Sequence, residues 1–196
     1  MDRKTLDKLI SSTGAVLAVV LLIGGVLLTW AGGFVNAQVS NQLTAQRITM
    51  PAGDAIAKLE NEADRKALEP FAGQPLEGPR QAQAFADHYI LAHMNASSGG
   101  RTYEEVSGEY TKLSDEEKAS EDGQALGALR QTLFMGNTLR GTLLTAYAFG
   151  TIGEIAFIAA GVAYAGAVGL GVLSFLGFRH AKRIQSVAQT TPVAVA

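Results

Sequence analysis

The sequence contains no cysteine among its 196 residues. Disulfide bonds, thiolate nucleophiles and the cysteine-based zinc and iron–sulfur sites are therefore excluded. The lack of thiols also leaves the central part of the chain free to lie in an oxidising compartment.

Charge is missing from two long stretches of the chain. Residues 14–35 form a run of 22 without a charged side chain, and residues 143–178 contain a single one, Glu154. Within the second stretch, residues 155–178 supply 24 uncharged residues in succession. A helix needs about 20 mostly apolar residues to cross the hydrocarbon core of a bilayer, so both stretches predict transmembrane helices. The second is expected to begin between Leu143 and Ile155.

The charged residues are distributed unevenly around these two stretches. The leader at 1–13 has three basic and two acidic residues, and the tail at 179–196 has only basic ones. Residues 36–141 contain fifteen acidic and ten basic residues, a net charge of −5. The positive-inside rule therefore predicts cytoplasmic termini and an extracytoplasmic domain at 36–142. An acidic domain disfavours nucleic acid as a partner, because nucleic-acid binding needs a basic surface.

The first apolar stretch has a second interpretation. Its basic leader and the sequence Val35-Asn36-Ala37 are typical of a secretory signal peptide and its cleavage site. The apolar run is longer than the usual ~7–15 residues of a signal peptide, and Trp30 stands near its far end, as expected at the headgroup level of a membrane. We therefore favour an uncleaved membrane anchor.

The central segment has the signals of a mostly helical domain. Residues 36–47 are expected to extend the first helix out of the membrane, and residues 48–51 to be extended because they precede Pro51. Further helices are expected at 55–68, with Asp54 as N-cap, and at 80–95, where apolar residues follow a 3.6-residue period. The fold class predicted is an all-α membrane protein in which two transmembrane helices flank a mostly helical extracytoplasmic domain.

Capping signals divide the rest of the segment. Gly99 and Gly100 are expected to end the helix before them, and Thr102 with Glu105 and Ser114 with Glu117 match the capping-box pattern of a helix start. No proline occurs between Gln124 and Phe178, so one continuous helix is expected to enter the membrane.

Small residues recur at four-residue spacing in both apolar stretches. The residues are Gly25, Thr29 and Gly33 in the first stretch and Gly161, Ala165 and Gly169, followed by Gly177, in the second. Such a stripe lets helix backbones approach closely in lipid. We expect these residues to pack helices together, mainly within the chain, with a partner subunit as the alternative.

Two charged residues near the second span are candidates for a special role. Glu154 could transfer protons, bind a cation or pair with a basic residue, because an ionisable group inside a span is a functional candidate by default. At the edge of the span it could instead simply reach water, which we favour. Arg140 is expected near the membrane surface, where Glu154 or a lipid phosphate could be its partner.

No pattern predicts a catalytic, metal or cofactor site. His88 and His93 are five residues apart, which is not the spacing that puts two ligands on one metal ion, and residues 97–102 lack the glycine–lysine pattern of a phosphate loop. The remaining candidate is a small-molecule pocket. Its expected lining is Phe85, Tyr89, His93 and Tyr103.

Parts of the outer segment resemble a known family. Residues 71–79 read FAGQPLEGP, an alanine-rich helix ending near His93 follows, and GGRTY begins six residues later at Gly99. With Ile48 and Thr49 upstream, these features resemble small two-span membrane proteins of actinobacteria that are often named after an aromatic ring-opening dioxygenase. The resemblance implies the two-span architecture and an actinobacterial envelope. We do not transfer the activity, because its Fe(II) site needs two suitably placed histidines and a carboxylate.

These observations together predict a non-catalytic accessory, assembly or scaffolding protein of the bacterial plasma membrane, with lipid and either a membrane-protein partner or further copies of itself as partners. The alternative is a membrane-anchored sensor whose outer domain binds a small molecule or lipid. No cofactor is expected.

Overall fold

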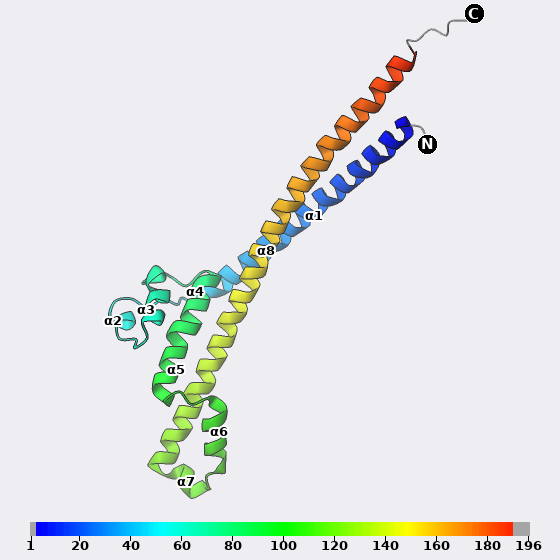
Figure 1. Ribbon diagram of the computed structural model, residues 1–196. Helices are drawn as coiled ribbons and strands as arrows, with labels where there is room; N and C mark the ends of the chain where they lie inside the picture. Colours follow the sequence, from blue (N-terminus) through cyan, green and yellow to red (C-terminus); the bar gives the residue numbers. More distant parts are fainter. Residues whose placement is uncertain (1–2, 190–196) are drawn as a thin grey trace, which may run out of the picture. The chain divides into compact units, whose positions relative to one another are not determined.

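The computed structural model describes residues 3–189 and the side chains of residues 5–183, and its regular secondary structure in that range is entirely helical (Figure 1). The all-α prediction is therefore confirmed for the described residues. The last part of the predicted basic tail, residues 190–196, lies outside them, as do the first two residues of the predicted leader.

Two very long helices dominate the chain. Helix α1 covers Arg3–Ala45 and α8 covers Glu121–Gln189, and each contains a segment long and apolar enough to cross a membrane. The predicted extension of the first helix and the uninterrupted second helix are both confirmed. Threonines within α8 bond to the carbonyls of the preceding turn, as Thr145 does to Gly141 at 2.8 Å, so their hydroxyls are satisfied without leaving the helix.

The chain forms two compact units. Unit 1 consists of Met1–Phe34 with Gly153–Ala196, and unit 2 is Val35–Ile152. Unit 2 thus continues ten residues past the predicted end of the outer domain at 142, because the first turns of the apolar stretch pack into its core through Leu143.

Unit 2 begins with an irregular segment after α1. Residues around Thr49 and Pro75 form an isolated antiparallel bridge, in which Met50 donates to Gln74 at 2.8 Å and Leu76 donates to Ile48 at 2.8 Å. This agrees with the extended backbone expected before Pro51. The bridge holds the connector in place, and its side chains Met50 and Leu76 are buried in the core.

The single helix predicted at 55–68 is wrong. The structure has two short helices there, α2 (Asp54–Ala57) and α3 (Glu62–Leu68), and Asp54 is the first residue of α2 rather than its cap. The break occurs because the Asn61 side chain caps α3 by accepting from Ala63 at 2.9 Å, while Arg65 donates to the Leu59 and Glu60 carbonyls. A 3-10 turn, η1 (Glu69–Phe71), follows α3.

The helix predicted at 80–95 is present but changes type along its length. It runs as α4 (Pro79–Ala84), a π-helical segment η2 (Phe85–Ile90) and α5 (Leu91–Ser98). Gly99, with φ of 64°, ends it in the left-handed conformation. Helices α6 (Tyr103–Lys112) and α7 (Asp115–Ala119) begin at the two predicted capping boxes, both of which are formed.

The core of unit 2 has two parts. The larger cluster joins the end of α1 to the bridge, α3, α4 and α8, with Leu43, Leu68 and Leu76 at 2%, 0% and 1% exposure. The smaller cluster consists of Met94, Val106 and Leu133, which join α5, α6 and α8. Figure 1 shows α5 and α6 alongside the upstream part of α8. This part of α8 is therefore the surface on which α5 and α6 pack.

Candidate functional site

In unit 1, α1 and α8 meet along a seam of small residues. The buried residues of α8 recur every seven positions: Gly153, Ala160, Ala167, Ser174 and Ala181. A strict seven-residue repeat keeps one face of a helix against its partner in a left-handed supercoil. On α1, buried Ser11, Gly25 and Gly32 are also spaced at multiples of seven. We call this set of residues the seam.

The backbones approach each other very closely in the seam. A Cβ atom added to Gly32 would lie 3.0 Å from the Gly153 carbonyl oxygen, and one added to Gly177 would be only 2.1 Å from the Ser11 hydroxyl. A larger side chain at Gly32 would need the facing backbone to shift, and one at Gly177 would need the Ser11 hydroxyl to move. Glycine, alanine and serine therefore set the distance between α1 and α8.

One polar contact crosses the seam. The Thr29 hydroxyl donates to the Gly25 carbonyl at 2.8 Å and lies 3.1 Å from the Tyr164 hydroxyl. The Tyr164 ring covers Gly25, where an added Cβ would be 2.7 Å from it. Because Gly25 has no side chain, it leaves room for the Tyr164 ring, and the Tyr164 hydroxyl has Thr29 as its partner.

The predicted packing stripes only partly coincide with the seam. Gly25 and Thr29 contact Tyr164, whereas a Cβ added to Gly33 would meet nothing within 4 Å. The set Gly161, Ala165 and Gly169 is exposed on α8, so these residues do not pack against α1. The prediction of packing within the chain was wrong for them, because they are one or two residues away from the buried Ala160 and Ala167, and each residue of an α-helix is rotated by about 100° from the one before it. Gly177 does face Ser11.

Arg140 has partners inside unit 2 that the sequence did not suggest. Arg140 donates to the Asp87 carboxylate at 2.9 Å and to the Ala86 carbonyl at 3.1 Å, and its side chain is 21% exposed. It therefore connects α8 to the π-helical segment inside unit 2. Glu154 has an exposed side chain on α8, beside Gly153 of the seam.

The π-helical segment places two polar side chains, Asp87 and His88, against other helices. Ala86, fully buried, accepts the backbone N–H of Leu91 and the guanidinium of Arg140 on the same carbonyl. His88 Nδ1 is 2.8 Å from Asp64 on α3. π-segments are rare and often occur at functional sites. Here the widened turn directs Asp87 toward α8 and His88 toward α3, so it holds three helices together.

The predicted pocket residues are divided between the two cores. Phe85, Tyr89 and His93 form a column of rings with centroid distances of 5.2 and 4.3 Å, and Phe85 and Tyr89 pack on the larger core. Tyr103 packs on the smaller core, with its ring 5.8 Å from that of Phe134. The four side chains therefore do not form the single lining that the sequence suggested.

A polar groove lies beside this column. It has a volume of about 580 Å³ and runs between the segment 58–64 and α5. Its lining includes Asp64, Asn61 and Glu60 on one side and His93 and Asn95 on the other. Of the four predicted pocket residues, His93 is the one that reaches it. Among residues 3–189, no three histidine, aspartate or glutamate side chains gather as a metal-binding group.

Arg130, Ser107, Tyr103 and Tyr110 form a cluster in unit 2. Arg130 donates to the Ser107 hydroxyl at 2.9 Å and lies 6.0 and 5.4 Å from the ring centres of Tyr103 and Tyr110. The hydrogen bond with Ser107, together with Arg130, lowers the pKa of Tyr103. The cluster fastens α6 to α8. Sequence reasoning did not identify it, because its members are up to 27 residues apart and no local pattern marks them.

The residues that sequence reasoning missed share one property. Asp64, Asp87 and Arg130 are charged side chains that become partners only when distant helices pack. Comparison with protein-family models, with curated proteins and with solved structures finds no match to this chain. The arguments for its function therefore rest on its own residues.

Proposed function

We propose that the protein is a non-catalytic accessory or scaffolding protein of a bacterial plasma membrane, inserted through α1 and α8 with both termini in the cytoplasm. Unit 2 then stands on the outer side and binds a second membrane protein of an envelope or respiratory complex. The observation that supports this proposal best is an exposed, uncharged face on the part of α8 that belongs to unit 2.

This partner face follows a coiled-coil spacing. Alternating steps of four and three residues give Phe134, Thr138, Gly141, Thr145, Ala148 and Ile152, all of them exposed. Met135, Leu139 and Phe149 flank the face with 51%, 52% and 53% exposure. Exposed apolar surface of this extent marks interaction sites, and the spacing suits a partner helix.

The charges of α8 avoid the partner face. Between Arg130 and Glu154 the helix has one charged residue, Arg140, and that side chain is turned toward Asp87. Gly141 is open, with nothing within 4 Å of an added Cβ, so a second helix could approach closely there. These features favour a tightly packed helix over a polar ligand as the occupant.

Lipid alone does not account for the partner face. The seam from Ser11 to Gly32 already contains 22 residues of α1, which is enough to cross the hydrocarbon core of a bilayer. Residues 134–152 precede Gly153, the first seam residue of α8. The partner face begins at Phe134, nine residues before the apolar stretch at 143–178, and this first part needs a protein to cover it.

The test is affinity purification from native membranes in a gentle detergent, with a tag on the C-terminus. The wild-type protein should retain a partner in a fixed stoichiometry. Thr138→Glu with Thr145→Glu places charges on the partner face and should reduce retention by about tenfold or more. Ala125→Glu with Ala128→Glu adds the same charges at exposed positions nearer the start of α8 and should leave retention unchanged.

Three outcomes would contradict this proposal. A monomer without a partner would remove the reason for an accessory role. A partner retained equally by both variants would show that the partner face is not used. A homo-oligomer lost in the Thr138→Glu/Thr145→Glu variant would replace the accessory role with self-assembly.

A second candidate function, ligand sensing, is favoured by the groove beside α5. Carboxylate, amide and imidazole groups converge there from two segments, as in sites that orient a small polar ligand. A thermal-shift screen of small polar molecules tests it. A ligand that stabilises the wild-type protein but not Asn95→Ala would support sensing, and a screen without any such ligand would leave only the accessory role.

A further inference from the structure

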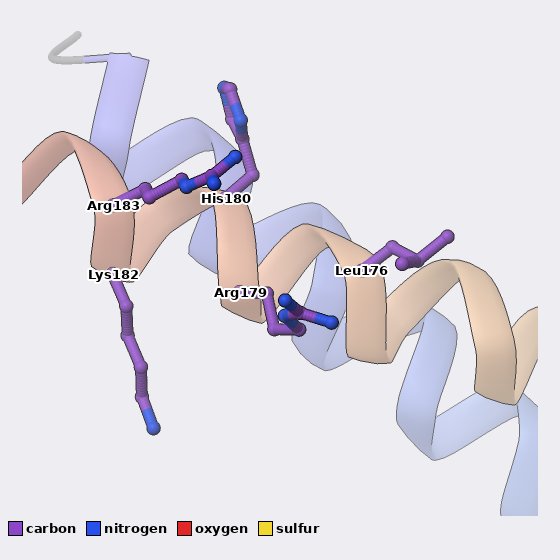
Figure 2. A pocket seen from close by; sticks show the side chains of 5 residues that line it. All are labelled: Leu176, Arg179, His180, Lys182 and Arg183. Carbon is purple, nitrogen blue, oxygen red and sulfur yellow. The ribbon is translucent and has the colours of Figure 1, made fainter.

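The C-terminal end of the apolar segment of α8 forms a basic pocket (Figure 2). Its volume is about 590 Å³, and it is lined by Leu176, Arg179, His180, Lys182 and Arg183. In Figure 2 the Arg183 side chain extends back toward His180, whereas Lys182 points away from the other side of the helix. Among the described residues, none of those that line it is acidic. We call this hollow the basic pocket.

The spacing of the lining explains the concentration of charge. Residues 176, 179, 180 and 183 follow the i, i+3, i+4, i+7 pattern and so share one face of the helix. The guanidinium of Arg179 lies over the Phe175 ring at 6.0 Å, which orients it near the helix. Arg179 and Arg183 are permanently cationic, and arginine binds phosphate with two parallel hydrogen bonds. The basic pocket is therefore suited to a phosphate group.

An apolar groove adjoins the basic pocket and shares Leu176 and His180 with it. The groove has a volume of about 440 Å³ and lies between α1 and α8 of unit 1. Its remaining lining is Asp7, Ile10, Ser11, Gly14, Leu170, Leu173, Ser174 and Gly177. The small residues of the seam open this groove, and leucines form its wall. Its surface suits a hydrocarbon chain.

Asp7 is an acidic residue of α1 that lies near His180. The Asp7 carboxylate, in the apolar groove, is 4.0 Å from His180 Nε2. Because this carboxylate is close to the His180 imidazole and repels anions, we expect Arg179 and Arg183, and not His180, to provide the main attraction for an anionic group. Lys182, on the other side of the helix, adds to the local positive charge without joining the same face.

We propose that the basic pocket and the apolar groove together bind one anionic phospholipid, its phosphate on Arg179 and Arg183 and an acyl chain along Leu173 and Leu176. The combination of a phosphate site and an adjoining apolar groove suits a phospholipid. A free phosphate has no hydrocarbon chain that could fill the groove. This inference rests on the membrane insertion assumed in the proposed function, and it adds a specific lipid at the C-terminal end of the second span.

The test is native mass spectrometry of the full-length protein, purified in mild detergent and mixed with phosphatidylglycerol or phosphatidylcholine of identical acyl chains. The wild-type protein should retain more phosphatidylglycerol than phosphatidylcholine. Each arginine near an anionic headgroup contributes about a fivefold factor, so Arg179→Gln with Arg183→Gln should weaken retention by about 25-fold. The variant Arg179→Lys with Arg183→Lys keeps both positive charges and should still retain most of the phosphatidylglycerol. The control variant Arg101→Gln with Lys112→Gln removes two positive charges from unit 2 and should leave the retention of phosphatidylglycerol unchanged.

Two results would overturn the proposal. One is equal retention of the two lipids by the wild-type protein, a comparison that needs no variant to fold. The other is inorganic phosphate displacing phosphatidylglycerol at comparable concentration, since the acyl chain would then contribute nothing. A protein removed from membranes by alkaline carbonate would instead contradict insertion and hence the proposed function. An inserted protein without lipid preference would contradict only this inference.

Discussion

The two compact units hold their helices together by opposite means. In unit 1, the seam brings two backbones into contact through glycine, alanine and serine, with a Cβ on Gly32 only 3.0 Å from a carbonyl oxygen. In unit 2, large side chains such as Leu43 and Leu68 fill a core, and charged pairs such as Arg140 with Asp87 join its helices.

The difference follows from the solvent that each unit is expected to meet. Water drives large apolar side chains into a core, so unit 2 gains stability from burying them. Between two helices in lipid that driving force is absent, and close contact of the backbones provides the attraction. Enlarging a residue should therefore damage unit 1, whereas shortening one should damage unit 2.

The largest effect is expected from shortening a core residue of unit 2. Leu68→Ala should lower the free energy of unfolding by about 2–5 kcal/mol, because Leu68 is fully buried and its loss leaves a cavity. Leu139→Ala is the matched control, and since Leu139 is 52% exposed the change should stay within about 0.5 kcal/mol. Urea unfolding of the full-length protein, followed by circular dichroism, measures both. Equal losses would mean that Leu68 is not a core residue.

The converse experiment enlarges a seam residue. Gly32→Leu should separate α1 from α8, whereas Gly33→Leu, next along the helix, points into open space. The readout is a disulfide between Gly14→Cys and Ser174→Cys. A Cβ on Gly14 lies 3.8 Å from the Ser174 Cβ, which is the spacing of a disulfide.

Oxidation should cross-link this two-cysteine protein, and the absence of native cysteine leaves no competing thiol. Gly32→Leu should slow cross-linking by at least about fivefold, the equivalent of the usual cost of overpacking. Gly33→Leu should not slow it. If both variants cross-linked at the rate of the two-cysteine parent protein, the seam would lie elsewhere on α1.

The polar connections of unit 2 should have smaller effects that depend on burial. Arg140→Gln should cost about 1–2 kcal/mol of unfolding free energy, because Arg140 and Asp87 are 21% and 31% exposed and form a charged hydrogen bond. Arg101→Gln removes a more exposed pair, at 44% and 55%, and should cost about 0–1 kcal/mol. Chemical denaturation of the two variants side by side measures the difference, and the reverse order would contradict the assigned role of Arg140.

The smallest effect is expected from the capping boxes. Hydrogen bonds from the backbone N–H and then the hydroxyl of Thr102 lower the pKa of Glu105, and those of Ser114 lower the pKa of Glu117. A carboxyl whose pKa is lower in the folded state stabilises it above the unfolded pKa, and this contribution disappears as pH falls through the folded pKa. Stability should therefore decline slightly from neutral pH toward acid.

Glu105→Gln with Glu117→Gln provides the control for this decline. Carboxyl groups titrate between about pH 6 and pH 3. In this range the stability of the double variant should fall less steeply than that of the wild-type protein. Thermal unfolding at a series of pH values measures the two slopes. A steeper decline in the double variant would contradict the direction of the shift.

Local features of the fold could be predicted from local sequence. The capping boxes at Thr102 and Ser114, the left-handed end at Gly99 and the uninterrupted α8 all depend on residues within one or two turns of each other. The helix expected at 55–68 failed because the interaction of Arg65 with the Leu59 carbonyl, which helps to break it, has no recognised sequence signal.

The candidate sites were predictable only in part. Gly25 and Thr29 contact Tyr164, and the seven-residue repeat from Gly153 to Ala181 selects different small residues on α8 from those expected. In a helix rich in glycine and alanine, several faces satisfy the same spacing, and contact with α1 decides among them. The partner of Arg140 was likewise missed, because Asp87 is 53 residues away.

The sequence by itself determined that the chain is helical, that two of its helices are long and apolar, and where its capping boxes lie, because backbone hydrogen bonding, hydropathy and capping act between near neighbours. The tertiary structure alone decided which small residues form the seam, where α2 and α3 separate, and how Arg140, Asp87 and His88 are paired. These features depend on contacts between segments far apart in the chain, for which many arrangements are compatible with the same local pattern.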